Sequence, residues 1–117
     1  LYKNLKIENF SIWPGSELKL LESLKIGCTG IITATCNVTA TLARKVYDDF
    51  YENKTAIEDV KLCNVRKVFD QFNLISGLHT FLAKKNKIYE NILPPISLLE
   101  EKDKKKMLED LMKLDFN

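Results

Sequence analysis

Two short segments of the sequence carry the side chains that could do chemistry. They are Pro14-Gly15-Ser16-Glu17 and Thr33-Ala34-Thr35-Cys36-Asn37, and each follows a run of β-prone residues. Ligands of parallel sheets bind where the strands end, so both segments are candidates for a binding site. Gly15 would let a ligand approach the backbone, while Ser16 and Glu17 would open a helix whose free N–H groups favour a carboxylate. The residues alone leave it equally open that one segment is only a strand-to-helix turn and the other only a helix cap.

The rest of the chain contains no complete catalytic set. His79 is the only histidine, and the three cysteines lie in apolar surroundings without the CxxC spacing of a zinc site. We expect a structural histidine, no metal site and buried thiols in a reducing cytoplasm. The four glycines match neither the dinucleotide-binding nor the P-loop pattern. We therefore expect no cofactor.

The composition is that of an ordinary globular protein and argues against two classes of partner. Of the 117 residues, 45% are hydrophobic and 29% charged, and no apolar run approaches the ~20 residues of a membrane span. The formal charge is +2, and every basic side chain except Arg44 and Arg66 is a lysine. Nucleic-acid-binding proteins have a stronger basic bias that includes arginine. We expect neither a nucleic-acid nor a membrane partner.

A strand–helix–strand unit is expected to position the two chemical segments. Residues 10–13 are β-prone and stop at Pro14-Gly15, and residues 30–35 form the β-branched run typical of buried parallel strands. Between them, Ser16 caps a helix that ends at Gly27. Two parallel strands do not make a stable sheet by themselves. The pattern therefore predicts the C-terminal part of a larger α/β enzyme whose other strands are missing.

The sequence after Asn37 has the pattern of successive helices. Capping boxes predict helices that open at Thr55 and at Ser97, with Ile57 and Val60 on the apolar face of the first. Pro94-Pro95 forces an extended link before the last helix.

The two chemical segments also carry a resemblance to a known family. The run Trp13-Pro14-Gly15-Ser16-Glu17, followed by Leu24-x-x-Gly27-x-x-Gly30-Ile31-Ile32-Thr33-Ala34-Thr35-x-Asn37-Val38, resembles the dihydrodipicolinate synthase / N-acetylneuraminate lyase family. A weaker likeness continues to Leu93-Pro94-Pro95-Ile96-Ser97, before the last helix.

The resemblance implies a particular fold and division of the chain. It implies the C-terminal fragment of a (β/α)8 TIM barrel, with the last two parallel strands at residues 10–13 and 30–34. Residues 1–52 would be the last βαβα part of the barrel, and residues 53–117 a C-terminal helical appendage. The Schiff-base lysine of the family would lie before Leu1, so this chain lacks it.

The resemblance also implies a set of substrate-binding residues. Gly15 and Ile32 match the positions whose backbones line the pocket for pyruvate. Ser16 and Glu17 match a loop that reads hydroxyl groups of the second substrate in the sialic-acid-cleaving branch, and Ala34 stands where that branch has a serine.

The function that follows is that of a cytoplasmic, Schiff-base (class I) lyase or aldolase. It would act on pyruvate or another 2-oxo acid with an aldehyde as partner, as in dihydrodipicolinate synthase, and the family likeness suggests a dimer or tetramer of identical chains. One alternative is an aldolase for 2-keto-3-deoxy sugar acids or sialic acid. The other is a non-catalytic helical interaction module that packs its amphipathic helices on a partner.

Overall fold

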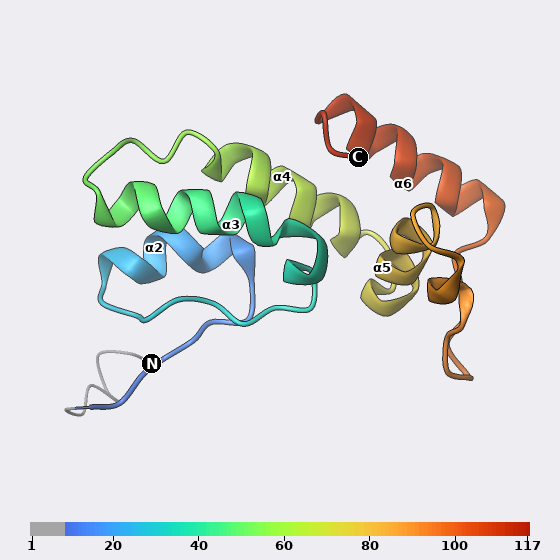
Figure 1. Ribbon diagram of the computed structural model, residues 1–117, viewed down its shortest axis with the longest axis horizontal. Helices are drawn as coiled ribbons and strands as arrows, with labels where there is room; N and C mark the ends of the chain where they lie inside the picture. The colour runs from blue at the N-terminus through green and yellow to red at the C-terminus, as the bar shows by residue number, and fades with distance from the viewer. Residues whose placement is uncertain (1–8) are drawn as a thin grey trace.

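The computed structural model describes residues 9–117 as an elongated array of helices, with extents of 47 × 30 × 22 Å (Figure 1). Residues 1–8 of the predicted first part lie outside the described residues. Figure 1 shows α2, α3 and α4 side by side at one end and α5 and α6 at the other. The elements in chain order are η1 (Glu17–Lys19), α2 (Leu20–Lys25), α3 (Cys36–Tyr51), α4 (Asp59–Asp70), α5 (Leu74–Ala83), η2 (Lys87–Glu90) and α6 (Glu101–Lys113).

The prediction of a TIM-barrel fragment with two parallel strands is wrong, because residues 9–117 contain helices and loops but no β-strand. The two segments expected to be strands are joined by two hydrogen bonds of 3.1 Å, from Thr29 N–H to Ile12 O and from Ile32 N–H to Pro14 O. Pro14 has no N–H to donate in return, and the offset between partners shifts by one residue from the first bond to the second. A continuous ladder therefore does not form, and the segments stay extended chain.

The signals that flank the first helix are confirmed. The Ser16 hydroxyl accepts a hydrogen bond from Leu18 N–H at 3.2 Å, which makes Ser16 the N-cap of η1. At the other end, Gly27 has a φ of 101°, a left-handed conformation that glycine adopts without strain. Between them, the chain forms a 3-10 turn before α2, so the expected single helix has two parts.

Both capping-box predictions are wrong, because each helix begins later than expected. α4 follows the N-cap residue Glu58 and α6 follows Glu100, and neither side chain caps its helix by a hydrogen bond. Ile57 therefore lies before α4, where it is 72% exposed. Val60, also exposed, lies about 200° around the helix from the fully buried Leu62.

The core consists of two apolar clusters that share α4. One cluster packs Leu62 of α4 against Val46 of α3 and Leu20 and Leu24 of α2. The other joins α4, α5 and α6 through Val65, Val68, Phe69, Leu78, Phe81, Met107 and Leu111. Burying such a side chain contributes about 1.5–3 kcal/mol, so α4 holds together helices from both ends of the chain.

His79 has the structural role expected for it. It lies in α5, and its Nδ1 is 2.8 Å from the carbonyl oxygen of Tyr89, with the two rings in an edge-on contact. The contact ties the η2 segment to α5. Within the described part of the chain, the helices are too short or too polar to cross a lipid bilayer.

Candidate functional site

The structure brings together Gly15 and Ile32, two of the residues predicted to bind substrate. Ile32 N–H donates to Pro14 O at 3.1 Å, and a Cβ placed on Gly15 would lie 3.9 Å from the carbonyl oxygen of Ile32. Gly15 is exposed, and Ile32 is 70% exposed. The backbones of the two segments therefore meet at the surface, where a ligand could contact both.

Ser16 and Ala34 border this meeting point. Ser16 is half-buried, and its hydroxyl already caps η1. Ala34 is exposed in the turn before α3, and its carbonyl oxygen accepts a hydrogen bond from the side-chain amide of Asn37 at 2.8 Å. The two residues offer a ligand one hydroxyl group and one methyl group, and neither carries a charge.

Glu17 differs from the other predicted residues because its side chain is 0% exposed. Its Oε1 accepts hydrogen bonds from the hydroxyl groups of Thr33 at 2.8 Å, Thr39 at 2.9 Å and Thr35. Its Oε2 accepts one from Nη1 of Arg66 at 2.7 Å. Both carboxylate oxygens are therefore engaged by the protein itself.

Arg66 is the partner that sequence reasoning missed. It lies in α4 with its side chain 11% exposed, and its Nε also donates to Asp70 at 2.8 Å. Its Nη1 lies 3.3 Å from the Thr35 hydroxyl, so the guanidinium reaches the threonines as well as the carboxylate. The only hint in the sequence is that arginine is rare, since Arg44 and Arg66 are the only two in the chain. No local pattern could pair Arg66 with Glu17, because the two residues are 49 positions apart.

The charges of this cluster are stabilised by their contacts. Burial alone would raise the pKa of Glu17, but hydrogen bonds from Thr35, Arg66 and Thr33 outweigh it and hold the pKa below its ordinary value. Burial would lower the pKa of Arg66, yet the hydrogen bonds to Asp70 and Glu17 raise it. Glu17 therefore stays ionised at neutral pH, which suits an ion pair and not a proton donor.

Two thiols lie beside the cluster, and that of Cys63 is not activated. The Sγ atom of Cys36 lies 3.7 Å from Glu17 Oε1, and Cys63 lies 3.8 Å from Oδ1 of Asp59. Burial and the negative charge of Asp59 raise the pKa of Cys63. A thiol of raised pKa is a poor nucleophile at neutral pH. Within the described residues, no group of three or more histidine, cysteine or acidic side chains could hold a metal ion.

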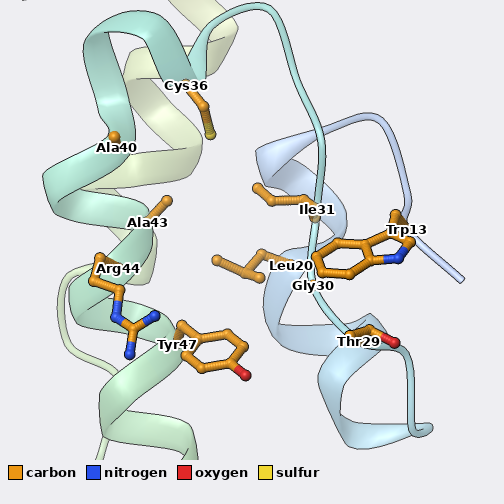
Figure 2. Close-up of a pocket in the computed structure, with 10 residues that line it drawn as sticks. All are labelled: Trp13, Leu20, Thr29, Gly30, Ile31, Cys36, Ala40, Ala43, Arg44 and Tyr47. Atoms are coloured by element: carbon orange, nitrogen blue, oxygen red, sulfur yellow. The ribbon is translucent and has the colours of Figure 1, made fainter. Parts of the chain in front are cut away.

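A surface groove of about 300 Å³ lies between α3 and the extended segment that contains Gly30 (Figure 2). Figure 2 shows Arg44 and Tyr47 of α3 on one side, and Trp13 beside Gly30 on the other. The Arg44 guanidinium lies 4.9 Å from the centre of the Tyr47 ring and is paired with Asp48 at 2.8 Å. The lining of the groove is mainly apolar, and the Arg44 cation at its edge is paired with Asp48.

Comparison with known proteins gives a family and a solved structure. The sequence matches the model of the Dihydrodipicolinate synthetase family over residues 2–114. The fold is similar to that of a dihydrodipicolinate synthase from Bacillus anthracis, with a TM-score of 0.81 and 14% sequence identity. The alignment covers 93% of this chain but 38% of that chain, so this chain spans well under half of that synthase. No curated protein matches the sequence.

Proposed function

This chain belongs to the dihydrodipicolinate synthetase family, and from this membership we propose that it forms one wall of the 2-oxo acid pocket of a Schiff-base lyase. The observation that carries the proposal is the close approach of the Gly15 and Ile32 backbones at the surface. These are the two positions at which the family resemblance implies contact with pyruvate or another 2-oxo acid.

The proposed reaction begins at a lysine that precedes Leu1 in the protein. Its amine attacks the ketone carbon of the 2-oxo acid, water leaves, and an imine forms. On cleavage, the hydroxyl group on the aldehyde side loses its proton, the carbon–carbon bond breaks, and its electron pair passes toward the protonated imine nitrogen to leave an enamine and an aldehyde. On condensation, the carbon beside the imine first loses a proton to give the enamine, whose electron pair then attacks the aldehyde carbon. The coverage of the Bacillus synthase leaves room for such a lysine outside this chain, because most of that synthase has no counterpart among these 117 residues.

The residues of this chain would bind and orient the substrate. The open backbone at Gly15 lets the carboxylate end of a 2-oxo acid approach, since no side chain stands in its way. The carbonyl oxygen of Ile32 would face the reacting carbon, and Ser16 and Ala34 would border the aldehyde. Because these two side chains supply a single hydroxyl group, we propose a small aldehyde as second substrate.

Trapping of the imine tests this function. The full-length protein is incubated with pyruvate and borohydride, and its intact mass is measured. We expect one reduced pyruvyl group per chain and no adduct without pyruvate. Absence of the adduct in a folded full-length protein would contradict the lyase and favour a helical interaction module.

A matched pair of variants assigns the pocket to this chain. Gly15→Val adds methyl groups beyond a Cβ that already lies 3.9 Å from Ile32 O, so trapping at limiting pyruvate should fall. Ile75→Ala removes an exposed apolar side chain from α5 and serves as the control. Equal trapping by both variants would remove Gly15 from the pocket.

A further inference from the structure

We propose that Glu17 is a positioning residue, whose buried carboxylate holds the Gly15 and Ile32 backbones in the arrangement that binds the 2-oxo acid. This inference rests on the proposed function of these two backbones, and it assigns Glu17 a role other than contact with substrate hydroxyl groups. It starts from the enclosure of Glu17, which is 0% exposed and accepts hydrogen bonds at both carboxylate oxygens.

The contacts of Glu17 join segments that are far apart in the sequence. From the first turn of η1, the carboxylate reaches Thr33 and Thr35 in the turn before α3, Thr39 in α3 and Arg66 in α4. Thr33 in turn accepts a hydrogen bond from Cys36 N–H at 3.1 Å, at the start of α3. One carboxylate therefore fixes the start of η1 against the start of α3, with α4 behind both.

The two backbones in question are next to these contacts along the chain. Gly15 precedes Glu17 by two residues, and Ile32 directly precedes Thr33. The two segments are joined directly by the hydrogen bonds from Thr29 to Ile12 and from Ile32 to Pro14 and by the packing of Trp13 on Gly30. Two backbone hydrogen bonds at the surface do not fix a loop by themselves, because water competes for both and the net contribution of each is small. The charged cluster beneath the loops supplies the missing constraint.

Glu17 is also unsuited to reading a substrate directly. To reach a ligand, its carboxylate would have to leave three hydroxyl groups and a guanidinium, and would leave Arg66 facing the interior with one acidic partner, Asp70. Such a rearrangement breaks several hydrogen bonds to a charged group, which are stronger than those between neutral groups. Of the two neighbouring polar residues Ser16 and Glu17, only Ser16 has an accessible side chain.

The test compares Glu17→Gln with Arg66→Lys in the full-length protein. Neither variant changes an accessible side chain, but each weakens the charged cluster. Hydrogen exchange of the Ile32 amide reports on its bond to Pro14, independently of catalysis. We expect exchange of this amide to become about tenfold faster in both variants through local opening, and the Leu111 amide in α6 records any global destabilisation separately. Unchanged exchange at Ile32 would overturn the positioning role, whether or not the protein is a lyase.

The catalytic readout separates three roles of Glu17. For a positioning residue, the pyruvate concentration needed for half-maximal borohydride trapping rises about tenfold, although no aldehyde is present. For a reader of aldehyde hydroxyl groups, trapping with pyruvate alone stays at the wild-type level. For a residue that only stabilises the fold, trapping well below the unfolding temperature is also unchanged. Either of the last two results would overturn the inference.

A control variant removes a cation from a different buried carboxylate. Asp49 is 2% exposed and pairs with Lys45 at 2.8 Å in α3, with no hydrogen bond to either loop. Lys45→Gln should therefore leave both the Ile32 amide exchange and the pyruvate trapping unchanged. If wild-type protein traps no pyruvate at all, the proposed function fails, and the exchange measurement still decides the positioning role.

Discussion

Nη1 of Arg66 lies 2.7 Å from Oε2 of Glu17, although the two residues are 49 positions apart and lie in α4 and η1. The side chains are 11% and 0% exposed, so solvent screens this pair little. The pair joins the candidate substrate loops to the helix that runs through both core clusters.

Removal of the guanidinium should destabilise the protein strongly. Arg66→Met leaves the buried Glu17 without its cation, which costs about 3–5 kcal/mol in comparable buried pairs. Arg44→Met is the control, because its pair with Asp48 is largely exposed and worth at most about 1 kcal/mol. Urea unfolding measures both, and equal losses of unfolding free energy in the two variants would contradict a special role for Arg66.

The stability of the protein should fall in acid partly because of Glu17. Burial would raise its pKa, but hydrogen bonds from Thr35 and Arg66 keep it below the ordinary value of 4.5 in the folded chain. The unfolded chain therefore takes up this proton first as the pH falls, so the contribution of Glu17 is complete above 4.5 and is lost as the pH falls through its folded pKa. Glu17→Gln should make the unfolding free energy less dependent on pH in that range.

Asp59 provides the opposite case for the same measurement. Burial raises its pKa above the ordinary value of 3.8, so the folded chain binds this proton more tightly than the unfolded chain does. Ionisation of Asp59 therefore lowers the unfolding free energy as the pH rises above 3.8 and through its folded pKa. Asp59→Asn lacks this loss, so its unfolding free energy should rise more steeply with pH. If the slope of the unfolding free energy against pH changed in the same direction in both variants, the opposite pKa shifts of Glu17 and Asp59 would be contradicted.

The packing of Trp13 on Gly30 should be visible in fluorescence. A Cβ on Gly30 would lie 2.9 Å from Cζ3 of Trp13, so Gly30→Ala must displace the ring of the only tryptophan in the chain. We expect a shift of the emission maximum toward that of exposed indole. Gly77→Ala is the control, since its nearest neighbour would be Phe69 at 3.4 Å and not Trp13. An unchanged emission spectrum in Gly30→Ala would show that the ring does not pack there.

Phe69 should be the most sensitive apolar residue of α4. It is 0% exposed and meets the ring of Phe81 edge-on, with 5.8 Å between ring centres. Phe69→Ala should lower the unfolding free energy by about 3–5 kcal/mol, whereas Ile57→Ala, at a 72% exposed site, should stay within about 0.5 kcal/mol. Comparable losses of unfolding free energy in the two variants would show that Ile57 is buried in the core, which contradicts its exposed position.

Signals of local geometry could be predicted from the sequence, and tertiary contacts could not. The Ser16 cap and the left-handed Gly27 depend on a few neighbouring residues, and both are present in the structure. The prediction of two strands was wrong because a strand needs hydrogen-bonding partners from another part of the chain. The two extended segments share only two backbone hydrogen bonds. Glu17 was expected to face a ligand because the family resemblance places it in a loop that reads substrate hydroxyl groups. Its burial depends on Arg66, which no local pattern connects to it.

The membership of α4 in both apolar clusters has a thermodynamic consequence. Leu62 belongs to the cluster with α2 and α3, and Phe69 to the cluster with α5 and α6. Neither cluster can open without loosening the helix on which the other depends, so we expect the two ends of the molecule to unfold as one cooperative unit. Deletion of α6 should therefore destabilise α4 around Arg66. Through the ion pair between Arg66 and Glu17, it should also destabilise the loop that contains Gly15. Under the proposed function, the C-terminal helix would therefore influence binding of the 2-oxo acid indirectly, through α4.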